Sequence, residues 1–207
     1  MSDVLSFKII TIGDSGVGKT SIIRRFVFNT FEQDNLSTIG VNFSFKDCTI
    51  KNGNKVKIKV IDTAGQEKYK SLSKSYFKNA DGVLFVFAID DLQSFQNIRE
   101  WITLFNENNS GKEGIQKYLI GNKDDLDYDS KVDKSLIDSF LKETNYEYEY
   151  RSVSALKNDK RIDELFQEIG EKLFDNYKER KQSLIQLEKN KDKDRKKANC
   201  QICDFNE

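Results

Sequence analysis

The order of apolar and polar residues alternates between strand-like and helix-like stretches along the chain. Residues 7–12 form a short apolar run that stops at Gly13, as a buried strand would. Residues 41–50 and 55–61 alternate apolar with polar positions on either side of residues 52–54 (Asn-Gly-Asn), which tolerate a positive φ. This second pattern predicts a β-hairpin.

The alternation continues through the middle and the C-terminal part of the chain. Residues 82–89 are apolar at every position, which is typical of a central strand covered on both faces. Shorter runs at residues 118–120 and 148–153 predict two more strands. Apolar residues at helical spacing between the strands predict helices, at Ile22, Ile23 and Phe26; at Phe95, Ile98, Trp101, Ile102 and Phe105; at Leu136, Ile137, Phe140 and Leu141; and at Ile162, Leu165, Phe166, Ile169, Leu173, Phe174 and Tyr177.

Strands that alternate with helices predict an α/β fold. We expect a three-layer domain over residues 1–177, with a six-stranded, mostly parallel sheet, one antiparallel strand and helices on both faces. Residues 178–207 are predicted to form a helix extension and a disordered charged tail. Residues 188–197 are almost entirely Lys, Arg, Asp and Asn, and such a stretch cannot bury enough apolar area to offset its ordering entropy.

Composition excludes several classes of function. Lys and Arg together number 34, as do Asp and Glu, so the net charge of zero argues against a general nucleic-acid binder. The absence of His excludes Ser-His-Asp triads, histidine zinc sites and histidine general bases. Cys48, Cys200 and Cys203 form no disulfide framework and fit a reducing compartment. No secretory signal and no apolar run of about 20 residues is present, so we expect a cytoplasmic protein.

Residues 13–20 (Gly-Asp-Ser-Gly-Val-Gly-Lys-Thr) match G-x-x-x-x-G-K-[ST] between a predicted strand and a predicted helix. The glycines let backbone N–H groups converge on a phosphate chain, and the helix N-terminus adds positive charge. Lys19 is expected to reach the β- and γ-phosphates, and the Thr20 hydroxyl to bind Mg²⁺. The alternative is a glycine-containing turn without a ligand. The predicted phosphate-binding residues are Ser15, Gly16, Val17, Gly18, Lys19, Thr20 and Ser21.

Residues 62–67 (Asp-Thr-Ala-Gly-Gln-Glu) follow the second strand of the hairpin. An Asp at the end of a strand parallel to the first can face Mg²⁺ through a bound water, so Asp62 is the second predicted metal residue. Gly65 is expected to approach the γ-phosphate with its backbone N–H. Gln66 is the predicted catalytic residue, because its side chain can orient a water for in-line attack. A surface turn is the alternative.

Residues 122–125 (Asn-Lys-Asp-Asp) follow another strand and fit N-K-x-D. The Asp125 carboxylate can accept hydrogen bonds from N1–H and the 2-amino group of guanine. Adenine offers neither donor, so Asp125 would lose both bonds and stay desolvated. Lys123 is expected along the purine plane, and Asn122 is expected to tie this loop to the phosphate loop. Residues 154–155 (Ser-Ala) could supply a backbone N–H to guanine O6; a polar turn is the alternative for the Asn-Lys-Asp-Asp segment.

These motifs occur together, in the order and at the separations of one family. Over about residues 7–177 the chain resembles the small GTPases of the Ras superfamily, and it is most similar to the Rab family. The resemblance implies a P-loop G domain that binds GTP and GDP and uses Mg²⁺ as its cofactor. It also implies a molecular switch that acts in vesicle and membrane trafficking.

Several further assignments depend on the resemblance. Thr38 stands where the switch I threonine binds Mg²⁺ and the γ-phosphate, and Phe31 stands where an aromatic residue packs on the guanine edge. Residues 39–43 (Ile-Gly-Val-Asn-Phe) resemble the Rab signature I-G-V-D-F. Leu156 completes the predicted guanine site, at the Lys position of the family's S-A-K. The chain departs from the Rab pattern at Asn42 (usually Asp), Ile61 (usually Trp) and Leu156 (usually Lys), and the first two change the surface that effectors and exchange factors read.

The resemblance implies partners and a rate. An exchange factor, a GTPase-activating protein and effectors are expected at switch I (residues 37–43) and switch II (residues 65–72), on a monomeric G domain. Because the phosphate loop contains no Arg, intrinsic hydrolysis should be slow, on the order of 10⁻⁴ to 10⁻³ s⁻¹. Two alternatives stay open, a Rab-like scaffold that holds nucleotide without useful hydrolysis and a P-loop kinase.

The C-terminal segment carries a different prediction. Cys200 and Cys203 are spaced as C-x-x-C with four residues after them, which matches neither the usual Rab ending nor a C-a-a-X box. Basic residues exceed acidic ones in residues 189–197, and each net charge contributes about 1 kcal/mol near an anionic membrane. We expect prenylation of one or both cysteines and cycling to the cytosolic face of an internal membrane. A metal or redox pair and two unmodified cysteines are the alternatives.

Overall fold

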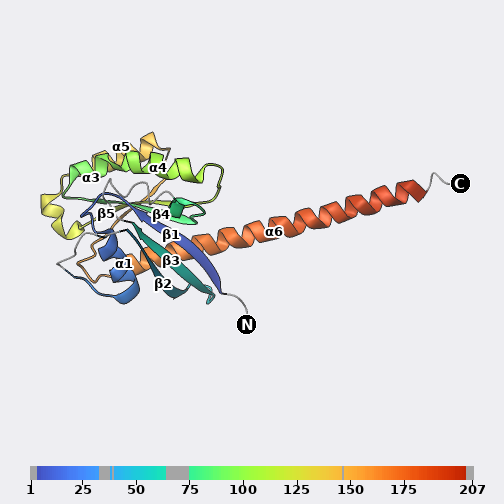
Figure 1. The fold of residues 1–207 in the computed structure, drawn as a ribbon, viewed down its shortest axis with the longest axis horizontal. Coiled ribbons are helices and arrows are strands. Elements are labelled where there is room, and N and C mark those ends of the chain that lie inside the picture. Colours follow the sequence, from blue (N-terminus) through green and yellow to red (C-terminus); the bar gives the residue numbers. More distant parts are fainter. Residues whose placement is uncertain (1–3, 33–37, 39, 64–74, 146, 204–207) are drawn as a thin grey trace.

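The computed structural model describes residues 4–32, 38, 40–63, 75–145 and 147–203. In this part of the chain the strands form one sheet in the order β2-β3-β1-β4-β5-β6 (Figure 1). The β2–β3 pair is antiparallel and every other pair is parallel. The strands are β1 (Leu5–Ile12), β2 (Val41–Thr49), β3 (Lys55–Thr63), β4 (Gly82–Ala88), β5 (Gln116–Asn122) and β6 (Glu149–Ser152).

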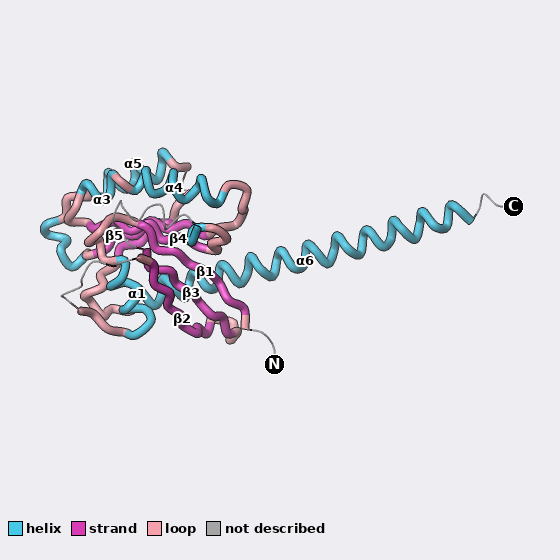
Figure 2. The backbone as a smooth tube through the Cα atoms, viewed as in Figure 1, coloured by secondary structure: helices cyan, strands magenta, loops and turns pink. Residues whose placement is uncertain are grey.

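Helices cover both faces of the sheet. Figure 2 shows α3, α4 and α5 on one face and α1 with the first part of α6 on the other. The helices are α1 (Lys19–Phe28), α3 (Leu92–Gln96), α4 (Ile98–Asn109), α5 (Lys134–Glu143) and α6 (Arg161–Cys203), and a 3₁₀ segment, η2, covers Asp124–Asp129. The predicted three-layer α/β fold with a six-stranded, mostly parallel sheet is therefore confirmed.

The position of β4 between two apolar cores explains why its sequence is apolar throughout. Leu84 and Val86 point into the core that contains side chains of α1 and α6. Phe85 and Phe87 point into the core that contains side chains of α4 and α5. Because successive side chains of a strand alternate between faces, a strand covered on both sides needs apolar residues throughout.

The predicted hairpin also forms, from β2 and β3. Its turn closes with bonds from Ile50 N to Asn54 O (3.0 Å) and from Gly53 N to Ile50 O (2.8 Å). Gly53 has a φ of 78°, the left-handed conformation that glycine adopts without a steric penalty.

The C-terminal helix differs from the prediction of a disordered tail from residue 188 on. The backbone of α6 stays helical through Cys203, and its distal part projects away from the domain (Figure 1). Lys, Glu, Gln, Leu and Arg have high helix propensity, and neither Gly nor Pro occurs after Gly170, so local preference favours the helix. Phe174 is the last buried apolar residue of α6 among the described side chains. The division of the chain at residue 177 stays a prediction.

None of the helices in the described ranges combines the length with the apolar character needed to cross a membrane.

Candidate functional site

The phosphate loop lies at the carboxyl end of β1 and leads into α1. Two of its glycines are required by their surroundings. Gly13 has a φ of 151°, and a Cβ there would lie 2.1 Å from the backbone oxygen of Val86. Gly18 has a φ of 94°, and a Cβ there would lie 2.2 Å from Nδ2 of Asn122. The loop can therefore pass close to β4 and β5 only because these positions lack side chains.

Lys19 is buried beneath the loop, with 5% of its surface exposed. Its ammonium group donates to the backbone oxygens of Gly13 (2.8 Å) and Asp14 (2.6 Å). Burial lowers the pKa of Lys19 to about 8, and the nearby Asp62 and Asp14 charges partly oppose that shift. A buried cation whose described hydrogen-bond partners are neutral carbonyls suits an anionic ligand such as phosphate.

Three oxygen-bearing side chains meet beside the phosphate loop. The Thr20 hydroxyl donates to Asp62 Oδ2 (2.7 Å) and lies 2.7 Å from the Thr38 hydroxyl. Asp62 is 4% exposed, and its other oxygen, Oδ1, is buried without a hydrogen-bond partner among the described residues. Burial raises the pKa of Asp62, although its Thr20 bond and the charge of Lys19 oppose this shift. Hydroxyl and carboxylate oxygens are the donors that Mg²⁺ prefers, so this set fits that ion.

Asn122 joins three loops at the carboxyl ends of the strands. It is 1% exposed; its Nδ2 donates to the backbone oxygen of Val17 (2.8 Å), and its Oδ1 accepts from the backbone N–H of Ala155 (3.2 Å). The expected tie between the Asn-Lys-Asp-Asp loop and the phosphate loop is present. The N–H of Ala155, which the sequence offers as a donor to guanine O6, already has an acceptor here.

The side chain of Asp125 is oriented by Ser154. The Ser154 hydroxyl donates to Asp125 Oδ1 and accepts from the backbone N–H of Lys157 (3.0 Å). Lys123 has a positive φ of 66°, and its ammonium lies 3.5 Å from Asp90 Oδ1. The fold thus gathers Asn122, Lys123, Asp125, Ser154 and Ala155, which are up to 33 positions apart in the sequence, around one loop cluster.

The remaining predicted residues are distributed as follows. Val17 and Ser21 are buried, whereas Ser15 and Gly16 are exposed. Phe31 is partly buried against the core that contains α1. Gly65 and Gln66 lie outside the described residues, as do all of residues 65–72 and residues 37 and 39 of switch I.

Two arginines missed by the sequence analysis hold these loops in place. Arg25 on α1 donates from Nε to the backbone oxygen of Ala155 (3.0 Å) and from Nη2 to that of Leu156 (3.2 Å). Arg161, at the start of α6, donates from Nη2 to Asp124 Oδ1 (2.9 Å) and from Nη1 to Oδ2. Burial alone would raise the pKa of Asp124, but the bonds and charge of Arg161 hold it below its usual value. Neither contact has a local sequence signal, because the partners are 130 and 37 positions apart.

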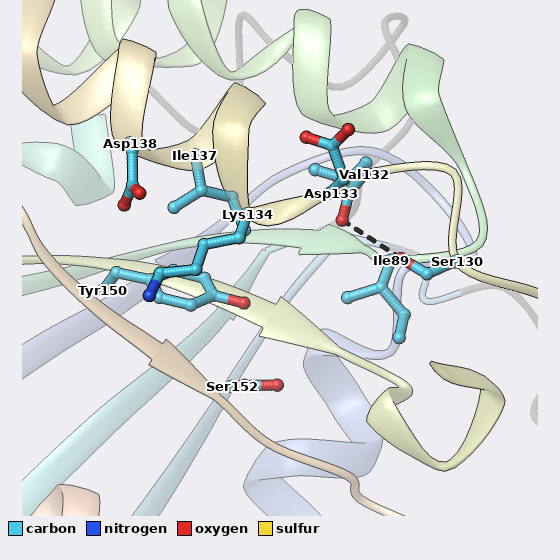
Figure 3. A pocket seen from close by; sticks show the side chains of 9 residues that line it. All are labelled: Ile89, Ser130, Val132, Asp133, Lys134, Ile137, Asp138, Tyr150 and Ser152. Atoms are coloured by element: carbon cyan, nitrogen blue, oxygen red, sulfur yellow. Dashed lines mark hydrogen bonds between the residues drawn. The ribbon is translucent and has the colours of Figure 1, made fainter. Parts of the chain in front are cut away.

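A cavity of about 440 Å³ is lined by residues of α5 and β6 and by the segment before α5 (Figure 3). Figure 3 shows Lys134 and Ile137 of α5 facing Tyr150 and Ser152 of β6 across this cavity. None of the predicted nucleotide-binding residues lines it.

A glycine-rich loop of the form G-x-x-x-x-G-K-[ST] between β1 and α1 of a mostly parallel sheet defines the class of P-loop nucleotide-binding proteins. Comparison with known proteins agrees, since the model of the Ras family matches residues 8–175. The chain belongs to the Ras family and is a small GTPase, that is, a GTP hydrolase.

Its relatives carry Rab names. Ras-related protein Rab-13 of Bos taurus is 38% identical over 164 residues, which cover 79% of this chain and 78% of the relative. Ras-related protein Rab-15 of Homo sapiens is 40% identical over 156 residues, which cover 75% of this chain and 71% of the relative. The predicted resemblance to a divergent member of the Rab group is thereby confirmed.

Proposed function

We propose that the chain is a Mg²⁺-dependent GTP/GDP switch that hydrolyses GTP slowly and regulates vesicle and membrane trafficking through effectors. The observation that carries the proposal is the cluster of Thr20, Thr38 and Asp62, in which a buried carboxylate oxygen has no described partner. A buried polar atom without a partner is rare in proteins, and a bound ion with its water shell is an ordinary explanation for one.

The ion would be held by the Thr20 and Thr38 hydroxyls and, through water, by Asp62. Bound Mg²⁺ would neutralise charge on the β- and γ-phosphates. Lys19, already buried beneath the loop, would exchange its carbonyl partners for phosphate oxygens. The same burial that lowers its pKa strengthens its attraction to an anion, because little water screens the pair.

Guanine selection is assigned to Asp125, which the Ser154 hydroxyl holds in one orientation. The Asp125 carboxylate must lose its bound water when a base enters. It therefore favours guanine, which donates two hydrogen bonds to it, over adenine, which donates neither. At about 1–3 kcal/mol for each unmade buried bond, a preference for GTP over ATP of about a hundredfold or more follows.

The switch would act through the two loops that meet the γ-phosphate. Thr38 and Gly65 are assigned contacts that only GTP offers, so hydrolysis would release the loops that carry them and change the effector surface. Gln66 would orient the attacking water. The phosphate loop supplies no Arg, so a GTPase-activating protein is assigned the missing charge stabilisation, and an exchange factor is assigned the replacement of GDP.

Membrane attachment would depend on the end of α6. Prenylation of Cys200, Cys203 or both would let a cytoplasmic protein cycle onto the cytosolic face of an internal membrane, aided by the basic residues before them. Intact-mass measurement of the chain from its native cells tests this directly. Added isoprenoid mass that is lost in a Cys200→Ser/Cys203→Ser variant supports it, and an unmodified mass refutes it.

The central experiment has two stages. Purified protein is given equal ATP and GTP with Mg²⁺, and the retained nucleotide is identified by chromatography; retention of GTP or GDP is expected, and retention of ATP or of neither refutes the proposal. Single-turnover phosphate release is then compared between the unmodified chain, Gln66→Leu and the control Gln182→Leu, whose Gln is exposed on α6. Only Gln66→Leu should slow release, with nucleotide affinity retained. Retained GTP without turnover would instead indicate a nucleotide-bound scaffold.

A further inference from the structure

The phosphate loop contains an acidic residue, Asp14, where electrostatics alone would disfavour one. A carboxylate beside a polyphosphate repels it, and Asp14 is close enough to Lys19 for its charge to raise the pKa of that ammonium group. The backbone oxygen of Asp14 accepts a hydrogen bond from Lys19 Nζ (2.6 Å), so Asp14 also helps to hold the lysine side chain in position. The repulsion between this carboxylate and a bound polyphosphate must therefore be offset by another interaction of Asp14.

The carboxylate of Asp14 is bonded to the α3–α4 junction. Its Oδ1 accepts from the indole Nε1–H of Trp101 (2.7 Å), and its Oδ2 accepts from Nδ2 of Asn97 (2.6 Å). Hydrogen bonds to an ionised acceptor are about twice as strong as neutral ones. Both oxygens are thus held by donors 83 and 87 positions further along the chain.

Both donors are themselves fixed. Trp101 is 2% exposed and lies in the apolar core beneath α4 and α5. Asn97 is the residue at which α3 ends and α4 begins, and its Oδ1 accepts from Gln93 Nε2 (2.8 Å). Through Asp14 the loop is consequently attached to a helix junction and to a buried core side chain.

We propose that Asp14 is a positioning residue that fixes the phosphate loop to the α3–α4 junction through Trp101 and Asn97, and that Trp101 thereby senses the nucleotide. The inference rests on nucleotide binding at the phosphate loop, as proposed above. The attachment holds the loop backbone, including the carbonyl oxygens that bind Lys19, in place before the nucleotide arrives. Less conformational entropy is therefore lost when the nucleotide binds. Without it, bound nucleotide should leave faster.

The rate at which a fluorescent GDP analogue leaves the full chain shows whether Asp14 acts through its hydrogen bonds to Trp101 and Asn97 or only through its negative charge. Asp14→Ala removes both bonds and the charge, and release should accelerate about tenfold, which corresponds to about 1.4 kcal/mol. Asp14→Asn removes the charge but keeps an oxygen for Trp101, so its release should stay within about threefold of the unmodified rate. Asp138→Ala, which removes an exposed acid on α5, is the control for net charge and should leave the rate unchanged.

Trp101→Phe keeps an aromatic ring but removes the N–H donor together with the five-membered ring of the indole. It should accelerate release in the unmodified chain but have little further effect in Asp14→Ala, because the two residues act through one bond. Thermal unfolding of each variant verifies that it is folded. Additive effects of the two substitutions would overturn the proposal, as would equal release rates in Asp14→Ala and Asp14→Asn.

The second readout is spectroscopic and uses the fact that the chain has one Trp. In a ¹⁵N-labelled chain the indole N–H gives a single resonance, which needs no assignment. It should move between the nucleotide-free, GDP-bound and GTP-analogue-bound protein, and Asp14→Ala should shift it and abolish those differences. Nucleotide that binds without moving this resonance contradicts the sensing role alone, whereas failure of any nucleotide to bind contradicts the proposed function.

Discussion

Asn122→Ala is expected to destabilise the domain by separating the phosphate loop from the base loop. The substitution removes the bonds to the backbone oxygen of Val17 and to the backbone N–H of Ala155, and both of these residues are at most 3% exposed. Each buried polar group left without a partner costs about 1–3 kcal/mol. Part of this cost is recovered if water enters, so we expect a loss of about 2–4 kcal/mol in the free energy of unfolding.

The assay is urea denaturation of the nucleotide-free protein, with the midpoint and slope both fitted. Asn108→Ala is the matched control, because it also removes a side-chain amide bonded to a backbone oxygen (Leu104, 2.8 Å) but lies within α4. The control should lose less than about 1 kcal/mol. Release of bound GDP should accelerate in Asn122→Ala and not in the control.

A third variant separates the two bonds. Asn122→Asp keeps an acceptor for Ala155 but brings a carboxylate against the oxygen of Val17, so it should be at least as unstable as Asn122→Ala. Equal unfolding free energies for Asn122→Ala and Asn108→Ala would refute the reasoning that this side chain joins the loops.

Three further predictions concern single residues. Asp125→Asn should reduce the preference for GTP over ATP about a hundredfold in competition binding, with folding unchanged; a retained preference would contradict its role. Gly13→Ala should destabilise the chain by about 3 kcal/mol or more in the same urea assay, because its Cβ meets a backbone oxygen, whereas Gly111→Ala faces open space and should lose only about 1 kcal/mol. Bonds and charges from Arg151 and Lys172 outweigh burial and lower the pKa of Glu168 to about 2. Its stabilisation is therefore complete above its ordinary pKa and is lost as pH falls from about 4.5 to 2, so Glu168→Gln should flatten the acid side of the Tm profile.

Much of the fold and the candidate site can be predicted from residue type and short-range order. The alternating pattern around residues 52–54 predicts the β2–β3 hairpin, because side-chain direction repeats every second residue in a strand. The glycines of the phosphate loop predict a backbone that other residues cannot adopt, as the positive φ of Gly18 illustrates. Each of these features depends on interactions over a few residues.

Local preference also accounts for the difference between the expected disordered tail and the extent of α6. The charged segment from residue 188 on has too little apolar surface for a core, which indicated disorder, yet its residues favour a helix and the backbone of α6 continues to Cys203. The low apolar content of a segment predicts that its side chains are not buried in a core. It does not predict whether the backbone of that segment forms a helix.

The contacts that orient the site were decided by tertiary structure. Asp14 meets Trp101, Arg25 meets Ala155 and Asp124 meets Arg161 only after β1, β4, β5 and β6 have paired side by side. A motif specifies which groups a loop carries, because backbone conformation and side-chain chemistry are local. It does not specify which distant donor satisfies a given carboxylate, because that depends on the strand register and helix packing that bring the two segments together.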